Sequence, residues 1–353
     1  MPLPLPPTVD PIRLTRYSHG AGCGCKIAPA VLDTILKSDL GIFPDPHLLV
    51  GYGTKDDAAV YDIGQGRALI STVDFFSPIV DDAFDFGLIA ATNALSDVYA
   101  MGGRPLLAVA VLGWPVDKLA PELAARVVEG GRKACHDAGI ALAGGHSIDA
   151  PEPFFGLAVT GEAPIAHIKR NDTARPGDAL WLTKPLGVGI LTTALKRDIL
   201  RSEHAKIATE LMCQSNQVGT ALGAIPDITA MTDITGFGLL GHLLEMCEGS
   251  CTCAQLDFMS VPVVPEAHTY LALGAYPDGS FRNWKSYSNK VEGAGSMDRM
   301  MILSDPQTSG GLLIATSPDL SLELGSIMQR MGARARRIGT MLPFSDGPRI
   351  RVE

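Results

Sequence analysis

The chain has 353 residues, 46% of them hydrophobic and 19% charged, which is enough for two domains that each bury a core. Its net charge is -9 at pH 7 and its lysines and arginines are scattered, which excludes the basic surface typical of nucleic-acid binding. The longest apolar stretch, Leu106 to Trp114, is about half of the roughly 20 residues that a membrane-spanning helix needs, so we expect no integral membrane protein.

The proline-rich N-terminus, Met1 to Pro7, has no basic head, no unbroken apolar run and no small-residue cleavage site. We therefore expect a short disordered tail and no secretory signal. The seven cysteines are an odd number in a chain too long to need disulfide bonds for stability. Both observations favour a reducing, cytoplasmic location.

The first half of the chain alternates predicted strands and helices. Residues 11–56 are rich in Gly, Pro, Asp and Ser and predict a mobile loop with one helix over 29–37. Further along, the pattern predicts strands over 57–62, 68–76, 106–112, 140–143 and 155–161, and helices over 86–101 and 121–137. This β-β-α-β-α-β-β order mixes hairpins with crossovers, so we expect an α+β layered domain.

The polar, turn-rich segment 167–178 predicts a domain boundary. Beyond it we expect strands over 179–183, 254–258, 312–315 and 337–342, and helices over 186–195, 203–222, 238–247 and 320–331. The sequence thus predicts two mixed α/β layered domains, 57–168 and 175–353, which follow a flexible N-terminal segment, 1–56.

A glycine-rich loop, His19-Gly20-Ala21-Gly22-Cys23-Gly24-Cys25-Lys26, carries two thiols beside an ammonium group. A nearby cation lowers the pKa of a thiol and makes it a better nucleophile. A flexible loop with incidental cysteines is the plainer interpretation. A metal site is weaker, because the two cysteines with His19 supply at most three ligands. The adjacent Lys26 favours a reactive loop.

Several aspartates stand at the ends of predicted elements: Asp56, Asp57, Asp74, Asp97 and Asp233. Hard oxygen ligands of this kind hold magnesium against phosphate groups. Each one alone is better explained as a helix cap, a turn former or a solvated charge. Asp97 is different, because it is predicted within an apolar helix, where a carboxylate needs a partner or a metal.

Two loops next to predicted strands could also serve a site. Gly144-Gly145 is predicted to follow a strand, where backbone amides can approach a phosphate or base, and a tight turn explains the pair equally well. Ser304 to Gly311 leads into an apolar strand and is either a turn or a source of hydroxyls and amides.

Other motifs carry less weight. Gly236 to Gly241 fits G-x-G-x-x-G, but Asp233 just upstream would repel a pyrophosphate. The P-loop and protein-kinase signatures are missing from the sequence, so phosphates would have to be held through metals and loop amides. A zinc site at Cys247, Cys251 and Cys253 lacks a well-spaced fourth ligand, which favours ordinary thiols.

Taken together, several segments resemble the selenophosphate synthetase (selenide, water dikinase) family, from about residue 12 to the C-terminus. They are Tyr17 to Lys26, Asp56 to Val60, Ser71 to Phe76, Ala143 to Ser147, Met231 to Asp233 and Asp305 to Gly311. The cysteine loop is the most specific of them. Related enzymes such as aminoimidazole ribonucleotide synthetase share the two-domain architecture and acidic site but are not expected to carry that loop.

The resemblance implies an aminoimidazole ribonucleotide synthetase-like fold, with ATP binding and dimerisation in the first domain. It implies the reaction of ATP, selenide and water to selenophosphate, AMP and phosphate, which supplies the selenium donor for selenoprotein and seleno-tRNA synthesis. Mg²⁺ is the implied cofactor. A homodimer with ATP near the subunit interface is implied as well, and a selenium-delivery protein is a candidate partner.

The family's functional positions carry over onto matching residues of this chain. Cys23 stands at the family's catalytic Cys/selenocysteine position, and Lys26 matches its essential lysine. The resemblance implies magnesium ligands at Asp57, Asp97 and Asp233. It implies nucleotide contacts at Lys26, Thr54, Lys55, Asp56, Asp74, Asp97, Gly145, His146 and Ser147. Selenocysteine, which some members use, is absent here.

Two other functions remain open at this point. An aminoimidazole ribonucleotide synthetase-like or thiamine-monophosphate kinase-like enzyme would use the same architecture, but the thiol loop argues against it. A thiol carrier or metal chaperone built on Cys23 and Cys25 would leave the aspartates without a role.

Overall fold

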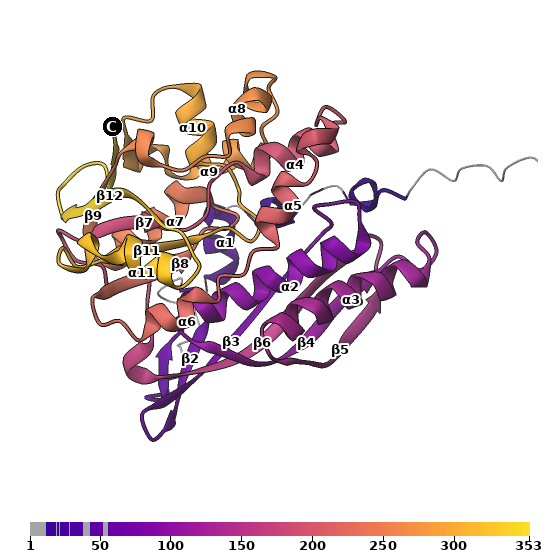
Figure 1. The fold of residues 1–353 in the computed structure, drawn as a ribbon, viewed down its shortest axis with the longest axis horizontal. Coiled ribbons are helices and arrows are strands. Elements are labelled where there is room, and N and C mark those ends of the chain that lie inside the picture. Colours follow the sequence, from indigo (N-terminus) through magenta and orange to yellow (C-terminus); the bar gives the residue numbers. More distant parts are fainter. Residues whose placement is uncertain (1–11, 19, 21, 28, 38–42, 52–55) are drawn as a thin grey trace, which may run out of the picture.

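The computed structural model describes residues 12–353 apart from positions 19, 21, 28, 38–42 and 52–55. Two β-sheets form the centres of two lobes that lie side by side (Figure 1). Before the first sheet, the N-terminal segment forms two short 3-10 helices, Leu14–Tyr17 and Gly22–Cys25, and the helix α1, Pro29–Leu36. The predicted α+β class is confirmed.

The first sheet has six strands in the order β1-β2-β3-β6-β4-β5. Their bounds are β1 Leu48–Val50, β2 Ala59–Gly64, β3 Arg67–Phe76, β4 Arg104–Trp114, β5 Ala141–Asp149 and β6 Phe154–Pro164. All neighbours are antiparallel except β4 and β5, which the helix α3 connects as a parallel crossover. The mixture of hairpins and one crossover is the predicted one.

Helices α2, Ala83–Ala100, and α3, Pro121–Asp137, lie along one face of this sheet (Figure 1). The two helices pack with their backbones in contact, because a Cβ at Gly87 would lie 1.8 Å from the carbonyl oxygen of Val127. Almost every residue of α2 is buried, since it packs on β3 and β6 on one side and against β8, α5 and α6 of the second lobe on the other.

The second sheet has seven strands in the order β10-β13-β9-β12-β7-β11-β8. Their bounds are β7 Ala179–Leu182, β8 Ile228–Asp233, β9 Thr252–Leu256, β10 Val291–Glu292, β11 Leu312–Thr316, β12 Arg336–Pro343 and β13 Ile350–Val352. The helices of this lobe are α4 Val188–Lys196, α5 Ile207–Met212, α6 Val218–Gly223, α7 Gly238–Gly249, α8 Pro265–Ala272, α9 Asp278–Tyr287, α10 Met297–Leu303 and α11 Leu324–Arg330.

Two sequence predictions about local structure are wrong. The predicted helix over 203–222 is divided into α5 and α6, because Asn216 between them turns inward to hydrogen-bond Ser96 and the carbonyl of Gly310. The predicted loop at Gly144-Gly145 lies inside β5. Helices α8, α9 and α10 were not predicted. No helix within the described residues has the length and apolarity needed to cross a membrane.

Candidate functional site

Four of the predicted aspartates converge where the two lobes meet. Asp57 precedes β2, Asp74 lies on β3, Asp97 on α2 and Asp233 at the end of β8. Their carboxylates are close enough to raise one another's pKa: Asp233 and Asp97 act on Asp57, and Asp233 and Asp74 act on Asp97. Residues spread over 177 positions of the sequence therefore form one acidic cluster.

On the first lobe, α2 and β3 position two of these carboxylates. Thr72 Oγ1 donates a hydrogen bond of 2.5 Å to Asp97 Oδ2, and Asn93 Nδ2 donates one of 2.5 Å to Asp74 Oδ2. Thr72 and Asp74 share a face of the strand, and Asn93 and Asp97 are one turn apart on the helix. The strand therefore orients the carboxylate on the helix, and the helix orients the carboxylate on the strand.

The other two carboxylates join the lobes. Ser96 of α2 donates a hydrogen bond of 2.5 Å to Asp233 Oδ2 at the end of β8, and Thr232 Oγ1 donates one of 2.8 Å to Asp57 Oδ1. Asn216 in turn donates to Ser96 Oγ at 2.8 Å. The relative position of the two lobes therefore determines the geometry of the cluster.

Burial sets the charge of the cluster. It is the largest cause that raises the pKa of Asp57, Asp97 and Asp233 above the usual value, and the neighbouring carboxylates add to it. Hydrogen bonds from Thr232, Thr72 and Ser96 act in the opposite direction. Like charges gathered in a buried place favour a cation that neutralises them.

The donor atoms fit magnesium. Asp57 Oδ2 is buried and has no hydrogen-bond partner among the described residues, so it retains its full capacity to ligate a cation. Within the same part of the chain, no three Asp, Glu, His or Cys side chains are arranged to hold one ion by themselves. Mg²⁺ usually keeps water and substrate phosphates among its ligands, so it does not need a ligand set supplied by the protein alone.

Lys26 brings a positive charge to the edge of the acidic cluster. Its Nζ donates a hydrogen bond of 3.5 Å to Thr235 Oγ1 and lies 6.0 Å from the ring centroid of Phe237. Its charge lowers the pKa of Asp97 and Asp233, so the ammonium is near both. Together with Asp74 it lines a cavity of about 250 Å³.

The loop around Lys26 is only partly described. The backbone at Cys23 forms the 3-10 helix Gly22–Cys25, and Gly22 N donates to the carbonyl of Ser77 at 3.0 Å. The side chain of Cys23 lies outside the described part of the chain, as do His19, Thr54 and Lys55. Asp56, beside the cluster, accepts a hydrogen bond of 2.7 Å from the backbone of Asn171.

Gly145, His146 and Ser147 lie apart from the acidic cluster. They are exposed on β5, an edge strand that β6 and β4 separate from β3. Gly145 has φ of 155°, and a Cβ there would lie 2.2 Å from the carbonyl oxygen of Ala110, so the glycine allows a bulge against β4. The predicted loop is thus a bulged strand whose side chains face outward.

Sequence reasoning missed Lys184 as part of the site's support. This lysine is buried, which lowers its pKa to about 7, and its Nζ donates to the carbonyls of Gln214 and Ser309 at 2.6 and 2.7 Å. Ser309 N donates to Asn93 Oδ1 at 2.8 Å. The sequence signal that could have identified Lys184 is its position just after the apolar strand β7.

The loop from Ser304 to Gly311 is completely buried and packs against the helices that carry or border the site. Asp305 Oδ2 accepts from the backbone of Gly189 at 3.0 Å at the start of α4, and burial raises the pKa of Asp305 to about 7. The backbone amide of Ser309 thus contacts α2, and the side chains of Asp305 and Gln307 accept hydrogen bonds from the start of α4, where Val188 N donates to Gln307 Oε1 at 3.3 Å.

The G-x-G-x-x-G segment follows β8 and begins α7, but the sheet around it is not a dinucleotide-binding one. β8 is an edge strand, and its neighbour β11 is antiparallel. The dinucleotide fold requires parallel strands joined by crossovers at this point. Gly238, with φ of 70°, instead allows close approach to the backbone of Ser304.

Comparison with known proteins agrees with this architecture. The AIR synthase related protein family matches with its N-terminal domain at residues 55–163 and its C-terminal domain at residues 175–347. Among solved structures, thiamine-monophosphate kinase from Stenotrophomonas maltophilia K279a is 22% identical, with a TM-score of 0.64 over 87% of this chain and 92% of that one. Hydrogenase maturation protein HypE in complex with ATP is 21% identical, with a TM-score of 0.60 over 94% and 90%.

Curated relatives are much more similar in sequence. Selenide, water dikinase from Aeromonas salmonicida (strain A449) is 57% identical over 97% of this chain and 99% of its own length. Selenide, water dikinase from Escherichia coli (strain K12) is 56% identical over 95% and 96%. At this identity over nearly the whole length, the chain belongs to the selenide, water dikinase (selenophosphate synthetase) family.

Proposed function

We propose that this protein converts ATP, selenide and water into selenophosphate, AMP and phosphate, and so supplies the selenium donor for selenoprotein and seleno-tRNA synthesis. The observation that carries the proposal is the convergence of Lys26 with the carboxylates of Asp57, Asp74, Asp97 and Asp233, in a chain of this family. Phosphoryl transfer depends mainly on positioning and charge neutralisation, which such an arrangement can provide.

The carboxylates would hold the nucleotide through metal ions when these are bound. Bound Mg²⁺ would neutralise the charge on the phosphates, with Asp57, Asp97 and Asp233 as its protein ligands. Asp57 offers a buried oxygen without another partner among the described residues, while Thr72 and Ser96 keep Asp97 and Asp233 oriented toward the same place. Asp74, held by Asn93, completes the acidic wall.

The reaction consists of two displacements at phosphorus. Selenium attacks the γ-phosphorus of ATP, a selenium–phosphorus bond forms, and the electron pair of the broken bond stays on the β-phosphate oxygen. Water then attacks the remaining diphosphate, which releases the β-phosphate as orthophosphate and leaves AMP. Lys26 stabilises negative charge that develops in transfer, since its ammonium lies at the edge of the cluster.

Cys23 brings selenium to this edge. It is three residues before Lys26, so its thiol is on the same loop as the ammonium that faces the acidic cluster. A lysine nearby favours the thiolate, which is the reactive form. We propose closure of this loop over bound ATP as the step that aligns the selenium donor.

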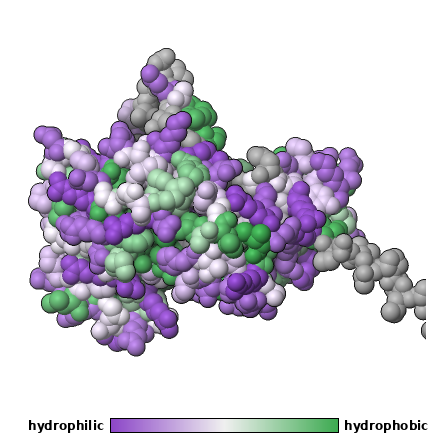
Figure 2. Space-filling view, turned by 90° about the horizontal axis from the view of Figure 1, so that it is seen from above, coloured by the Kyte–Doolittle hydropathy of each residue, from purple (hydrophilic) through white to green (hydrophobic). Residues whose placement is uncertain are grey.

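The uncovered face of the first sheet supports a homodimer. Apolar side chains on this face are exposed opposite the helices: Val73, Phe75, Leu107, Val109 and Ile148. Val73 and Val109 lie in one row across the sheet, because both pair with Ala158. Figure 2 shows one face of the molecule, seen from above, on which hydrophilic and hydrophobic side chains are intermixed, as is usual for a surface that faces solvent. A row of exposed apolar side chains is typical of a protein interface.

A dimer would also give β5 a function. Gly145, His146 and Ser147 are exposed at the edge of this sheet, separated from β3 by two strands, and the proposed interface would place them beside ATP.

We also propose a cytoplasmic location, because the cysteine thiols within the described residues are free, which is usual in a reducing compartment. A selenium-delivery protein is the further partner that we propose.

Phosphorus NMR of the purified protein with ATP, magnesium and anaerobic selenide tests the reaction. We expect AMP, orthophosphate and a selenium-bonded phosphorus signal to appear together. Lys26→Ala and Cys23→Ala should lower that rate by on the order of 100-fold, because each removes a group that acts at the transferred phosphoryl or its acceptor. Lys285→Ala, which removes an exposed lysine of α9, is the matched control and should leave the rate unchanged.

Two results would contradict the proposal. Untouched ATP, or ADP as the final nucleotide, would favour an enzyme of the aminoimidazole ribonucleotide synthetase or thiamine-monophosphate kinase type. Full selenide-dependent activity in Cys23→Ala would remove the proposed role of the thiol and leave the carboxylate cluster as the catalytic part.

A further inference from the structure

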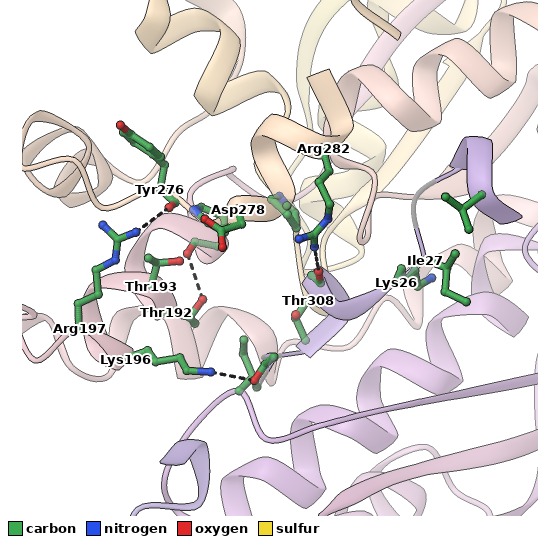
Figure 3. Close-up of a pocket in the computed structure, with 18 residues that line it drawn as sticks. Lys26, Ile27, Thr192, Thr193, Lys196, Arg197, Tyr276, Asp278, Arg282 and Thr308 are labelled. Atoms are coloured by element: carbon green, nitrogen blue, oxygen red, sulfur yellow. Dashed lines mark hydrogen bonds between the residues drawn. The ribbon is translucent and has the colours of Figure 1, made fainter. Parts of the chain in front are cut away.

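A second, larger cavity also borders Lys26. It measures about 660 Å³ and is bounded by the N-terminal segment, by α4, by the start of α9 and by the loop at Pro306 and Thr308 (Figure 3). Lys26 lines both this cavity and the smaller one that contains Asp74. The two spaces therefore share Lys26, the residue that we propose acts on the transferred phosphoryl group.

The cavity is positively charged. Lys26, Lys196, Arg197 and Arg282 line it, against one carboxylate, that of Asp278. The chain as a whole carries a net charge of -9, so the net positive charge of this cavity is opposite in sign to that of the whole molecule. In Figure 3, Lys196 lies at the end of α4, Arg197 follows it and points toward Tyr276 on the left, Arg282 comes from α9, and Lys26 lies on the right.

The arginines of this cavity have neutral partners. Arg197 Nη1 donates to the carbonyl of Gly274 at 2.7 Å, and Arg282 Nη2 donates to the carbonyl of Gly24 at 2.8 Å. Neither forms an ion pair within the described part of the chain, whereas Arg13 and Arg170 are paired with Asp81 and Asp172. A carbonyl oxygen orients a guanidinium but leaves its net charge uncompensated.

Hydroxyl groups complete the lining. Thr193 of α4 and Thr308 of the buried loop border the same space, as does Thr192, whose hydroxyl donates to the carbonyl of Val188 at 2.9 Å and so can only accept from a ligand (Figure 3). Guanidinium and ammonium groups combined with hydroxyls are the donors that bind phosphate oxygens. Metal ions are the usual partners of the acidic cluster, but a site of this composition binds an anion directly.

We propose that this cavity binds a tetrahedral oxyanion of the phosphate class, and that Arg197 and Arg282 are its principal ligands. This inference rests on the proposed function for the source of the anion: the orthophosphate released from ATP, or the phosphorylated product. Either one leaves an acidic cluster that repels it and meets positive charge in this cavity, which also borders Lys26.

Calorimetric titration of inorganic phosphate into the full chain, without nucleotide or metal, tests the site. Arg197→Gln and Arg282→Gln should each weaken binding by roughly 10-fold or more, because each removes a charge-assisted contact. Arg197→Lys should retain most of the affinity, since it keeps the charge while losing the fork that holds Gly274. Arg336→Gln is the matched control: it removes an exposed arginine that also donates to a backbone carbonyl, that of Met259.

The absence of phosphate binding in the wild-type protein, or equal affinity in all variants, would overturn the proposal. If Arg197→Gln or Arg282→Gln lost phosphate binding only together with a lower unfolding temperature, that arginine would be a structural residue and its assignment as a ligand would fail. Because the titration contains neither ATP nor selenide, its result is independent of the reaction assay. Thiophosphate, a stable stand-in for selenophosphate, separates the sources: tighter binding than phosphate identifies the phosphorylated product, and weaker or equal binding identifies orthophosphate.

Discussion

Asp97 shows how a single residue combines function with a cost to stability. Its carboxylate is buried in α2, and burial, then Asp233 and Asp74, raise its pKa well above the usual value of 3.8. The folded chain therefore holds this proton more tightly than the unfolded chain does. The resulting stabilisation is complete below pH 3.8 and is lost as the pH rises through the folded pKa.

Replacement of Asp97 by Asn should consequently stabilise the metal-free protein at higher pH. Asparagine can still accept the hydrogen bond from Thr72 but carries no charge. We expect a gain of roughly 1 kcal/mol, about 2 °C in unfolding temperature, at pH 8, which shrinks toward zero near pH 4. The variant should lose activity on the order of 100-fold or more, because a proposed magnesium ligand is removed.

Thermal unfolding in a chelator, followed from pH 4 to pH 8, measures this difference. Asp257→Asn is a control of opposite sign, because a hydrogen bond from Ser260 lowers the pKa of that exposed carboxylate, so it should show no gain. If the difference in unfolding temperature between Asp97→Asn and wild type stayed constant with pH, burial of a charged Asp97 would not be the cause, and this account would be contradicted.

Among the elements, α2 connects the fold with the site. One turn of it presents Asn93, Ser96 and Asp97 to three partners: the loop at Ser309, the end of β8 and the strand β3. Its position depends on α3, which it meets so closely that glycine is required at the crossing. Stability of this helix pair and geometry of the acidic cluster are therefore linked.

Gly87→Ala tests that link. The added Cβ would lie 1.8 Å from the carbonyl oxygen of Val127, so the helices must separate. We expect a loss of about 1–3 kcal/mol in the free energy of unfolding, measured with urea, and a parallel loss of ATP turnover. Gly325→Ala in α11 is the matched control: a Cβ there meets nothing within 4 Å, so stability should be unchanged or rise by up to about 1 kcal/mol. Equal effects of the two substitutions would refute the close-packing account.

At the scale of the whole molecule, the exposed apolar side chains on the uncovered face of the first sheet indicate a contact with another chain. Val109→Glu places a charge in the middle of this face, beside Val73 across β6. We expect a shift from dimer to monomer by light scattering, because a buried unpaired charge is costly at an interface. Leu322→Glu, at a more exposed apolar side chain of the second lobe, should leave the dimer intact. A monomeric wild-type protein would contradict the proposed dimer.

The sequence determined most of the elements and the chemical types of the site residues. Asp57, Asp74, Asp97 and Asp233 were identifiable because each interrupts an apolar pattern at the end or in the middle of an element, and periodicity is a local property. The thiol loop and its lysine were identifiable for a similar reason, as an unusual local composition. Family resemblance added their roles, which local patterns do not contain.

Tertiary structure alone decided which of these residues meet. Contacts between Asp57 and Thr232, or Ser96 and Asp233, join positions more than 100 residues apart, and only the packing of α2 between the lobes brings them together. The strand order separates Gly145 from the cluster, the hydrogen bond from Asn216 to Ser96 breaks the predicted helix, and the segments at Gln214 and Ser309 enclose Lys184. Each of these depends on a partner distant in sequence, and neither propensity nor periodicity carries that information.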